Sequence, residues 1–400
     1  MPINSLCARV FLIHTSILFM TLNQTYDKSN SILQMHGLSH QYTEVLSRIL
    51  AIDYAKHIIS NDDPLYLALE DLKVSQAIPN SKESIFKLRP HVLEEISRLY
   101  DYEIPRYLRY RYTYDVYPGM KRVGNYPPLV QIEPSSICNY RCIFCYQTDE
   151  RLTTKKNGHM GFMDINLFKN LIDQLEGNVE AVTLASRGEP LMNKFLPEMI
   201  AHMDGKFLAA KINTNASLLT EVLSHAILSS DLQTLVFSAD AAADPLYSKL
   251  RVGGNLDRVV GNIKRFYEIK TAHYPNSRLI TRVSGVHFQE DQDMNEMVEF
   301  WSQYVDQVAF VDYNPWDNVY DAKENSLLAP CSDLWRRLFV WWDGRIGPCD
   351  VDYLTTLSNE LYPDISISNV WNGDTFTNLR TKHLNNQRQD LNPCSRCVLV

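Results

Sequence analysis

The sequence contains no hydrophobic run long enough to cross a membrane. Its most apolar stretch, residues 10–20, is interrupted by His14 and is much shorter than the roughly 20 residues of a spanning helix. A signal peptide could have this length, but no small-residue cleavage site follows it. Translation can start at Met1 or at Met20; we favour Met20, and we expect a cytoplasmic protein without a membrane partner.

The sequence also lacks an excess of positive charge. Its 39 Lys and Arg residues are outnumbered by 47 Asp and Glu residues, and the net charge is −8. Binding to nucleic acid depends on cationic side chains that neutralise phosphates, so we expect no nucleic-acid partner. With 45% hydrophobic and 22% charged residues, the 400-residue chain has the composition of a globular protein with one large domain and one or two smaller ones.

Cysteine is scarce and unevenly placed. A chain that can bury a core of this size does not need disulfides for stability. Three of the eight cysteines lie within eight positions, four lie beyond residue 330, and Cys7 stands apart from both groups. This clustering indicates metal binding rather than disulfide pairing.

The first 122 residues are expected to form a mostly helical N-terminal extension. Segment 81–100 has apolar residues at helical spacing. Residues 102–128 are rich in Tyr, Arg and Pro, and we interpret them as a linker that lies on the next domain. We place a central domain at 123–325 and a C-terminal domain at 326–400.

From residue 128 onward, short apolar strands alternate with helical segments. Because parallel strands need crossover connections, this alternation predicts an α/β fold with a parallel sheet. Six units are too few for the eight-stranded barrel, so we expect a partial, TIM-like (β/α)6 barrel with its chemistry at the carboxyl ends of the strands. The six strands are predicted at 129–133, 181–186, 209–213, 234–239, 280–286 and 305–311.

The stretch CNYRCIFCYQ, residues 138–147, supplies three thiols and lacks a fourth. Structural zinc needs four ligands in a closed tetrahedron. Three thiolates instead suit a [4Fe–4S] cluster, whose iron prefers sulfur, and they leave its fourth iron open to another ligand. A zinc knuckle and a chance group of buried cysteines are the alternatives.

The spacing of Cys138, Cys142 and Cys145, with Phe144 before the last thiol, resembles the signature of the radical S-adenosylmethionine (SAM) superfamily. The resemblance implies that SAM binds the open iron through its amino and carboxylate groups, with Phe144 beside the cofactor. It also implies that one electron cleaves SAM to methionine and a 5′-deoxyadenosyl radical, which takes a hydrogen atom from the substrate. An external one-electron reductant, such as flavodoxin or ferredoxin, is then an expected partner.

The segment SRGEPLM, residues 186–192, follows the second strand and looks like the family's Gly-Gly-Glu-Pro segment. Arg187 replaces the first glycine and departs from that pattern. The resemblance implies that this segment holds the SAM amino group, and the residues we assign to the cofactor here are Ser186, Gly188, Glu189 and Pro190.

The next two strand ends also resemble segments of the family. Asn213 and Asn215 offer hydrogen bonds near the SAM site. Ser238 stands where the family commonly binds the SAM ribose or carboxylate, and Asp240 could bind cosubstrate or substrate.

Arg282 and Asp312 are our two candidate catalytic residues. Arg282 lies inside the fifth strand, where a barrel-facing guanidinium needs an anion such as the SAM carboxylate or a substrate group. An outward arginine paired with a helix carboxylate is the alternative. Asp312 ends the sixth strand, followed by Tyr313 and Asn314, where a substrate could be bound; a simple loop is the alternative.

The C-terminal region predicts a second metal site. Residues 338–349 are expected to form a hairpin that turns at Asp343-Gly344 and brings Cys349 back towards Cys331. Cys394 and Cys397 supply two further thiols. Four thiolates could hold either zinc or a fully ligated [4Fe–4S] cluster.

This pattern resembles the twitch module, the truncated form of the SPASM domain, which binds one auxiliary cluster. The resemblance favours a second [4Fe–4S] cluster and an oxidoreductase acting on a small molecule of the sugar or cyclitol type, like the twitch-domain dehydrogenases. Maturation of a peptide or protein side chain is the second hypothesis, and a non-catalytic iron–sulfur or zinc scaffold is the third.

Overall fold

The computed structural model describes residues 26, 32–38, 42–77, 85–289, 292–316 and 318–400. Stretch 10–20, Met20 and Cys7 lie outside the described residues. Within the described part of the chain, no helix is both long enough and apolar enough to cross a membrane.

The six predicted strands are confirmed and form the parallel centre of a nine-stranded sheet. The sheet order is β1-β9-β8-β6-β5-β4-β2-β10-β11. Each neighbouring pair from β2 to β9 is parallel, as expected for a partial (β/α)6 barrel. These six strands are β2 (Leu129–Ile132), β4 (Ala181–Leu184), β5 (Ala209–Thr214), β6 (Thr234–Ser238), β8 (Ile280–His287) and β9 (Gln307–Asp312).

Helices cover the outer face of this sheet and begin at polar caps. Asp164 accepts hydrogen bonds from two backbone N–H groups at the start of α8, and Asn255 caps α12 in the same way. The covering helices are α8 (Ile165–Leu175), α9 (Leu196–Met203), α10 (Glu221–Leu228), α12 (Leu256–His273) and α13 (Met294–Trp301).

Alternation along the strands decides which side chains face the barrel interior. Ala210 and Ile212 of β5 pack into the core beneath the helices. Lys211 and Asn213 alternate with these two residues along β5 and are half-buried. Because successive side chains of a strand point to opposite faces, they face the inner side of the curved sheet. Val283 of β8 belongs to the same helix-facing core, and therefore Arg282 also faces inward.

Both edges of the sheet are extended by segments from outside the six predicted units. β1 (Ile32–His36) pairs antiparallel with β9, and β10 (Arg337–Val340) pairs parallel with β2. β11 (Ile346–Gly347) returns antiparallel to β10, which confirms the predicted hairpin. The C-terminal region therefore shares a sheet with the barrel, and the domain boundaries stay a prediction.

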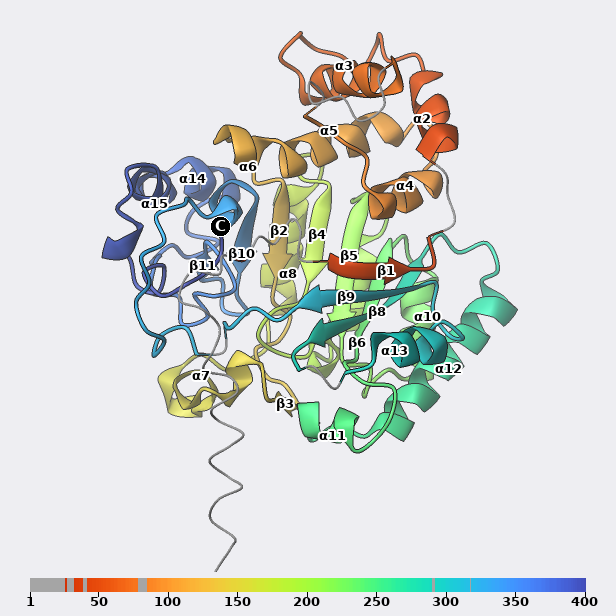
Figure 1. Ribbon diagram of the computed structural model, residues 1–400, viewed down its shortest axis with the longest axis vertical. Helices are drawn as coiled ribbons and strands as arrows, with labels where there is room; N and C mark the ends of the chain where they lie inside the picture. Colours follow the sequence, from red (N-terminus) through yellow and green to blue (C-terminus); the bar gives the residue numbers. More distant parts are fainter. Residues whose placement is uncertain (1–25, 27–31, 39–41, 78–84, 290–291, 317) are drawn as a thin grey trace, which may run out of the picture.

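The N-terminal extension packs as a helical layer against the amino ends of the strands (Figure 1). Its own hydrophobic core includes Leu129 and Ala181, at the starts of β2 and β4. The linker predicted at 102–128 is wrong for its first half, because these residues form α5 and α6. The helices of this layer are α2 (Tyr42–Leu50), α3 (Pro64–Ala77), α4 (Pro90–Ser97), α5 (Ile104–Asp115) and α6 (Tyr117–Met120).

The cysteine loop lies on the opposite side of the barrel, at the carboxyl ends of the strands (Figure 1). Two short strands tie it to the segment after β6, since β3 pairs antiparallel with β7. The loop elements are β3 (Arg141–Cys142), α7 (Glu150–Thr153), α11 (Leu246–Leu250) and β7 (Arg251–Val252), and the C-terminal region adds α14 (Ile367–Asn372) and α15 (Asp374–Leu384).

Candidate active site

The structure brings the three thiols of the first group together. Cys138, Cys142 and Cys145 belong to one hydrophobic cluster, which is closed by Phe144 and Leu250. Pairing of β3 with β7 fixes the middle of the loop, and the Cys145 amide donates to the Cys142 carbonyl at 3.1 Å. The loop therefore presents its thiols at the predicted end of the barrel.

Hydrogen-bond donors surround these sulfur atoms. The Tyr140 amide lies 3.4 Å from Cys138 Sγ, and Asn215 Nδ2 lies 4.0 Å from the same atom. Arg251 Nη1 lies 3.9 Å from Cys142 Sγ. Burial raises the pKa of the Cys138 thiol to about 12. Because iron binds thiolate, a bound cluster would offset this cost of burial, and the donors would stabilise its sulfur.

Glu189 forms the second wall of the site. Its carboxylate accepts hydrogen bonds from the Leu191 amide, the Thr214 hydroxyl and the Asn215 amide, at 3.0, 2.5 and 2.7 Å. Burial raises the pKa of this carboxyl group, and the three donors oppose that rise. Glu189 therefore contacts Asn215, whose side chain lies near Cys138 Sγ. That these two residues bind SAM stays a prediction.

Asn213 carries an unused acceptor on the inner face of β5. Its Oδ1 atom is buried and has no hydrogen-bond partner among the described residues. A buried polar atom without a partner is costly, so a ligand that donates a hydrogen bond would fit this position. An amine or exocyclic amino group, such as SAM contains, meets that requirement.

Gly188 is the residue that lets this segment approach the cysteine loop. A Cβ atom at this position would lie 2.3 Å from the Ser135 carbonyl oxygen and 2.6 Å from that of Ile137. Pro190 follows as the first residue of a short 3-10 turn, which the Glu189 side chain caps. The Gly-Glu-Pro segment therefore has a packing reason for each of its three residues.

We predict that Gly188→Ala lowers the free energy of unfolding by about 1–3 kcal/mol, because the methyl group meets backbone atoms that cannot move aside cheaply. Urea denaturation of the purified protein measures this. Gly261→Ala is the matched control, since Gly261 is exposed in α12 and a Cβ there meets nothing within 4 Å. The control should gain up to about 1 kcal/mol; equal effects of the two changes would contradict the packing argument.

Both carboxylate oxygens of Asp240 interact with other residues of the protein. Its Oδ1 atom accepts from the Val286 amide at 2.8 Å, and its Oδ2 atom lies 2.6 Å from Arg251 Nε in an ion pair. Through Arg251 the carboxylate positions a donor at Cys142. Ser238 ends β6 and is half-buried on the inner face. The assignment of both residues to the cofactor stays a prediction, while Arg251 escaped sequence analysis because no motif marks it.

The two candidate catalytic residues lie in different surroundings. Arg282 Nε donates to Gln307 Oε1 at 2.8 Å, and Arg282 lines a cavity at the amino ends of the strands, away from the cysteine loop. Asp312 is exposed at the end of β9, where its carbonyl accepts from the Tyr26 hydroxyl at 3.0 Å. The structure does not join these two side chains at one site, and their catalytic roles stay predictions.

Residues next to Asp312 face the cysteine loop instead. Tyr313 packs edge-on against Phe288 with 4.8 Å between ring centroids, and Phe288 packs against Phe144 at 5.5 Å. Asn314 is buried, and its Nδ2 atom has no hydrogen-bond partner in the described part of the chain. This aromatic wall, defined by Phe144, Phe288 and Tyr313, closes the site on the side of β8 and β9.

Arg187 explains why the sequence departs from Gly-Gly-Glu-Pro. Its guanidinium and the Glu133 carboxylate form a fully buried ion pair, with Nε and Oε1 2.7 Å apart. Arg187 Nη1 also donates to the Tyr353 carbonyl at 2.8 Å, and the guanidinium lies 4.1 Å from the centre of the Trp341 ring. The side chain therefore joins the barrel to the C-terminal region.

Gln147 is a further structural residue that sequence analysis missed. Its Nε2 atom donates to the Ser136 carbonyl at 2.8 Å and also to the Arg187 carbonyl. It thus ties the cysteine loop to segment 186–192. The only sequence signal is its place two residues after Cys145, within a polar stretch that otherwise suggests a solvated loop.

The four C-terminal cysteines also lie around one space, and their role as metal ligands stays a prediction. Cys331, Cys349, Cys394 and Cys397 all line one small cavity in the C-terminal region. Arg388, which is fully buried, donates to the backbone carbonyls of Cys394 and Cys397 at 3.1 and 2.6 Å. The seven described cysteines form no disulfide with one another. Four soft sulfur donors around one cavity fit a fully ligated iron–sulfur cluster.

The two thiol sites adjoin the same hydrophobic cluster. Cys145 on one side and Cys331 and Cys349 on the other pack against a core that contains Tyr146 and Tyr353. The rings of these two tyrosines lie 5.2 Å apart. One hydrophobic cluster therefore contacts cysteines of both thiol groups.

Two family models match successive parts of the chain. A family model described as the radical SAM superfamily matches residues 132–300, and a model described as an iron-sulfur cluster-binding domain, SPASM, matches residues 331–398. The fold and its thiol sites therefore define an iron–sulfur enzyme. The chain belongs to the radical SAM superfamily and carries a SPASM domain. The zinc and scaffold alternatives are set aside by this membership, which brings a [4Fe–4S] cluster, SAM and a further iron–sulfur cluster.

Individual relatives are distant. A probable GTP 3′,8-cyclase of Methanococcus maripaludis is 28% identical over 133 residues, which cover 33% of this chain and 43% of that protein. An Fe-coproporphyrin III synthase of Methanosarcina barkeri is 29% identical over 119 residues, covering 28% of this chain and 27% of the relative. The chain thus spans less than half the length of these curated relatives.

A solved structure shows the same fold over a larger part of the chain. Streptococcus suis SuiB bound to S-adenosylmethionine superposes with a TM-score of 0.52 at 16% identity, over 81% of this chain and 84% of that one. At this identity the match concerns the fold alone.

Proposed function

We propose that this enzyme oxidises a small-molecule alcohol of the sugar or cyclitol type by two electrons, with its single auxiliary [4Fe–4S] cluster as the electron acceptor. The observation that carries the proposal is the single cavity lined by all four C-terminal cysteines, which offers ligands for one cluster. A substrate radical left after hydrogen abstraction must lose an electron and a proton to become a carbonyl compound. An adjacent iron–sulfur site can take that electron.

The chain's own residues would prepare the site. Cys138, Cys142 and Cys145 would hold the first cluster, which when bound supplies the electron for SAM cleavage. Glu189, whose carboxylate accepts a hydrogen bond from the Asn215 amide, would orient SAM together with Asn215, and Asn213 would accept a hydrogen bond from SAM. These contacts use side chains that face the barrel interior at the carboxyl ends of β4 and β5.

The aromatic wall would keep water from the reacting carbon, because Phe144, Phe288 and Tyr313 present rings rather than polar groups. Asn314, with its unused buried donor, is the residue of the β9 loop best placed to bind a substrate hydroxyl. An external reductant such as flavodoxin or ferredoxin would supply the first electron. A cytoplasmic location belongs to this proposal, since both clusters need reduced thiols.

The test compares the wild type with Cys394→Ala after anaerobic reconstitution and reduction. We expect about eight irons per wild-type chain and about four in the variant. The wild type should form 5′-deoxyadenosine in step with oxidation of one member of a panel of cyclitols and sugars. In Cys394→Ala, SAM cleavage should persist while the oxidised product is lost.

Other outcomes would redirect the proposal. Modification of a peptide side chain, with no polyol oxidised, would favour the peptide-maturase hypothesis. Unchanged yields of oxidised product in Cys394→Ala would exclude the auxiliary site as electron acceptor.

A further inference from the structure

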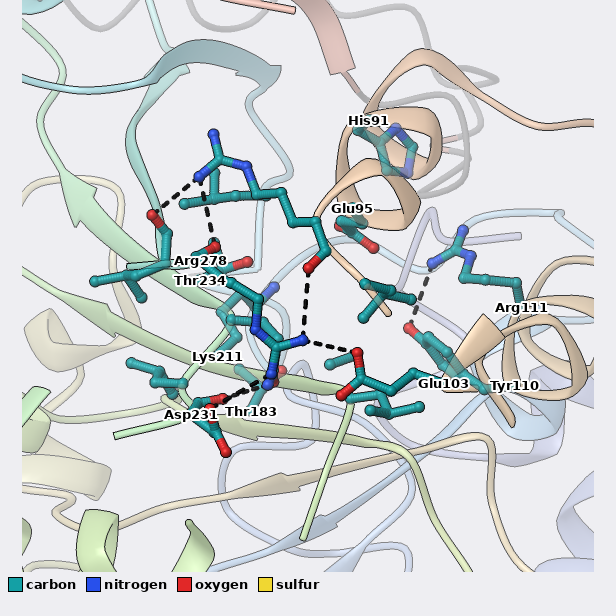
Figure 2. A pocket seen from close by; sticks show the side chains of 18 of the residues that line it. His91, Glu95, Glu103, Tyr110, Arg111, Thr183, Lys211, Asp231, Thr234 and Arg278 are labelled. Carbon is teal, nitrogen blue, oxygen red and sulfur yellow. Dashed lines mark hydrogen bonds and ion pairs between the residues drawn. The ribbon is translucent and has the colours of Figure 1, made fainter. Parts of the chain in front are cut away.

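A large cavity lies at the end of the barrel opposite the cysteine loop. Its volume is about 730 Å³, and it opens between the N-terminal helical layer and the amino ends of the strands. Figure 2 shows His91 and Glu95 of α4 and Arg111 of α5 on one side, and Lys211 of β5 with Thr183 of β4 on another. In this fold the chemistry occupies the other end of the barrel, so the cavity is separate from the active site.

Two cations project into this cavity from the inner face of the sheet. Lys211 has no hydrogen bond and no ion pair within the described residues. Arg282 satisfies only its Nε atom, on Gln307, and its buried Nη2 atom has no partner there. The Nε2 atom of Gln307 is likewise buried without a partner. Lys211 and Arg282 therefore both bring donors without hydrogen-bond partners among the described residues to this cavity.

Most other charges around the cavity are already paired. Arg278 binds Glu103 at 2.7 Å, and Arg111 binds Asp115 at 2.8 Å. Glu95 is the acidic residue that faces Lys211 and Arg282, and it also accepts a hydrogen bond from the Tyr107 hydroxyl. The single carboxylate of Glu95 is therefore not enough to neutralise the two positive charges of Lys211 and Arg282.

This imbalance has an electrostatic cost. Burial, together with repulsion from Arg282 and Arg337, lowers the pKa of the Lys211 ammonium to about 8. Burial lowers the pKa of Arg282 as well, opposed by Glu95. Buried cations are stable when an anion with suitable hydrogen-bond acceptors neutralises them.

We propose that this cavity binds a small oxyanion, a carboxylate or phosphate group, between Lys211 of β5 and Arg282 of β8. Both carboxylate and phosphate oxygens accept the parallel hydrogen bonds that a guanidinium donates, and an ammonium adds a point charge. The hydroxyl groups of Thr183 and Thr234 line the same space. The volume leaves room for the remainder of a small metabolite that carries the anionic group.

The test measures the thermal unfolding midpoint of the reconstituted full-length enzyme against inorganic phosphate and against succinate. Sodium chloride at equal ionic strength is the reference. A ligand that binds only the folded state raises the midpoint with concentration and saturates. Whether phosphate or succinate does so at the lower concentration identifies which source of the anionic group the cavity prefers.

Lys211→Met should weaken anion binding by about tenfold or more, and Arg282→Gln should do the same. Without added anion, Lys211→Met should raise the midpoint by about 1–2 °C, because it removes a half-buried cation that has no ion pair among the described residues. A purely structural lysine would give the opposite sign. Lys264→Met, on the exposed face of α12, is the matched control and should bind like the wild type.

The proposal is overturned if neither anion shows saturable stabilisation beyond sodium chloride. It is also overturned if Lys211→Met and Arg282→Gln, both folded, respond to anions as Lys264→Met does. Retention of iron by the Lys211 variant confirms that it is folded, so loss of binding can be assigned to the cavity.

Discussion

Replacing Cys142 by alanine is expected to abolish SAM cleavage, with a fall in 5′-deoxyadenosine formation of roughly a thousandfold or more. The three thiols of the loop lie in one cluster at the carboxyl ends of the strands, and each would hold one iron. With two thiolates the cluster cannot keep its geometry, and SAM loses its binding iron. The effect is larger than that of any residue that only orients SAM, because the source of the electron is removed.

The measurement is 5′-deoxyadenosine released after anaerobic reconstitution and reduction, together with iron per chain. Iron should fall from about eight to about four, because the C-terminal site is untouched. Cys7→Ala, made in a chain that starts at Met1, is the matched control, since Cys7 belongs to neither thiol group, and it should retain full iron and activity. Undiminished SAM cleavage in Cys142→Ala would contradict the assignment of this loop as the site of the SAM-binding cluster.

Arg187→Met is expected to lower the free energy of unfolding by about 3–5 kcal/mol, because it leaves the Glu133 carboxylate buried without its counter-ion. Both side chains of this pair are completely shielded from solvent. The change also removes the bond to the Tyr353 carbonyl and the stacking on Trp341, which join barrel and C-terminal region. Stability and the attachment of the SPASM domain should therefore weaken together.

Chemical denaturation of the single and double variants separates the pair from simple packing. Glu133→Gln combined with Arg187→Met should lose less than the sum of the two single changes, since no uncompensated charge remains. Arg106→Met is the control: its pair with Glu180 is partly exposed, with 44% of the arginine side chain accessible, and should contribute under about 1 kcal/mol. Equal losses at Arg187 and Arg106 would contradict the role of burial.

The fold was largely predictable from local patterns. The six apolar strands at 129–133 to 305–311 were recognised because a parallel strand is buried on both faces and needs a crossover helix after it. The C-terminal hairpin was recognised from its Asp343-Gly344 turn, and Gly344 indeed has a φ of +87°. These features depend on residues close together in the sequence.

Other parts of the fold depend on distant residues and were missed. The linker prediction over helix α5 rests on its Pro and Tyr content, because Tyr has only a modest helix preference. Tyr107 and Leu108 nevertheless bury completely against the rest of the helical layer. The pairing of β10 with β2 joins segments about 200 residues apart. No local sequence pattern predicts which strand pairs with β2 at this edge of the sheet. The edge can pair with any strand of suitable length and polarity.

Site residues divide in the same way. The two cysteine groups stand out in the sequence by their spacing, and the family resemblance, rather than the spacing alone, favours iron–sulfur clusters over zinc. Arg251, Gln147 and Arg388 were not, since each acts through atoms contributed by a remote segment. Near Asp312 the structure adds what the sequence does not show: Asp312 is exposed, whereas Asn314 is buried and its Nδ2 atom has no hydrogen-bond partner among the described residues. The catalytic role of Asp312 stays a prediction.

The sequence by itself determined the order of strands and helices and the two thiol groups, because these follow from periodicity and spacing along the chain. The superfamily was indicated by the resemblance of its motifs to those of known proteins. Only the tertiary structure decided what neutralises Glu133, which donors reach the sulfur atoms and where Arg282 lies. The physical reason is that the energetic cost of a buried charge or an unpaired hydrogen-bond donor depends on the groups around it. These groups come from segments far apart in the sequence.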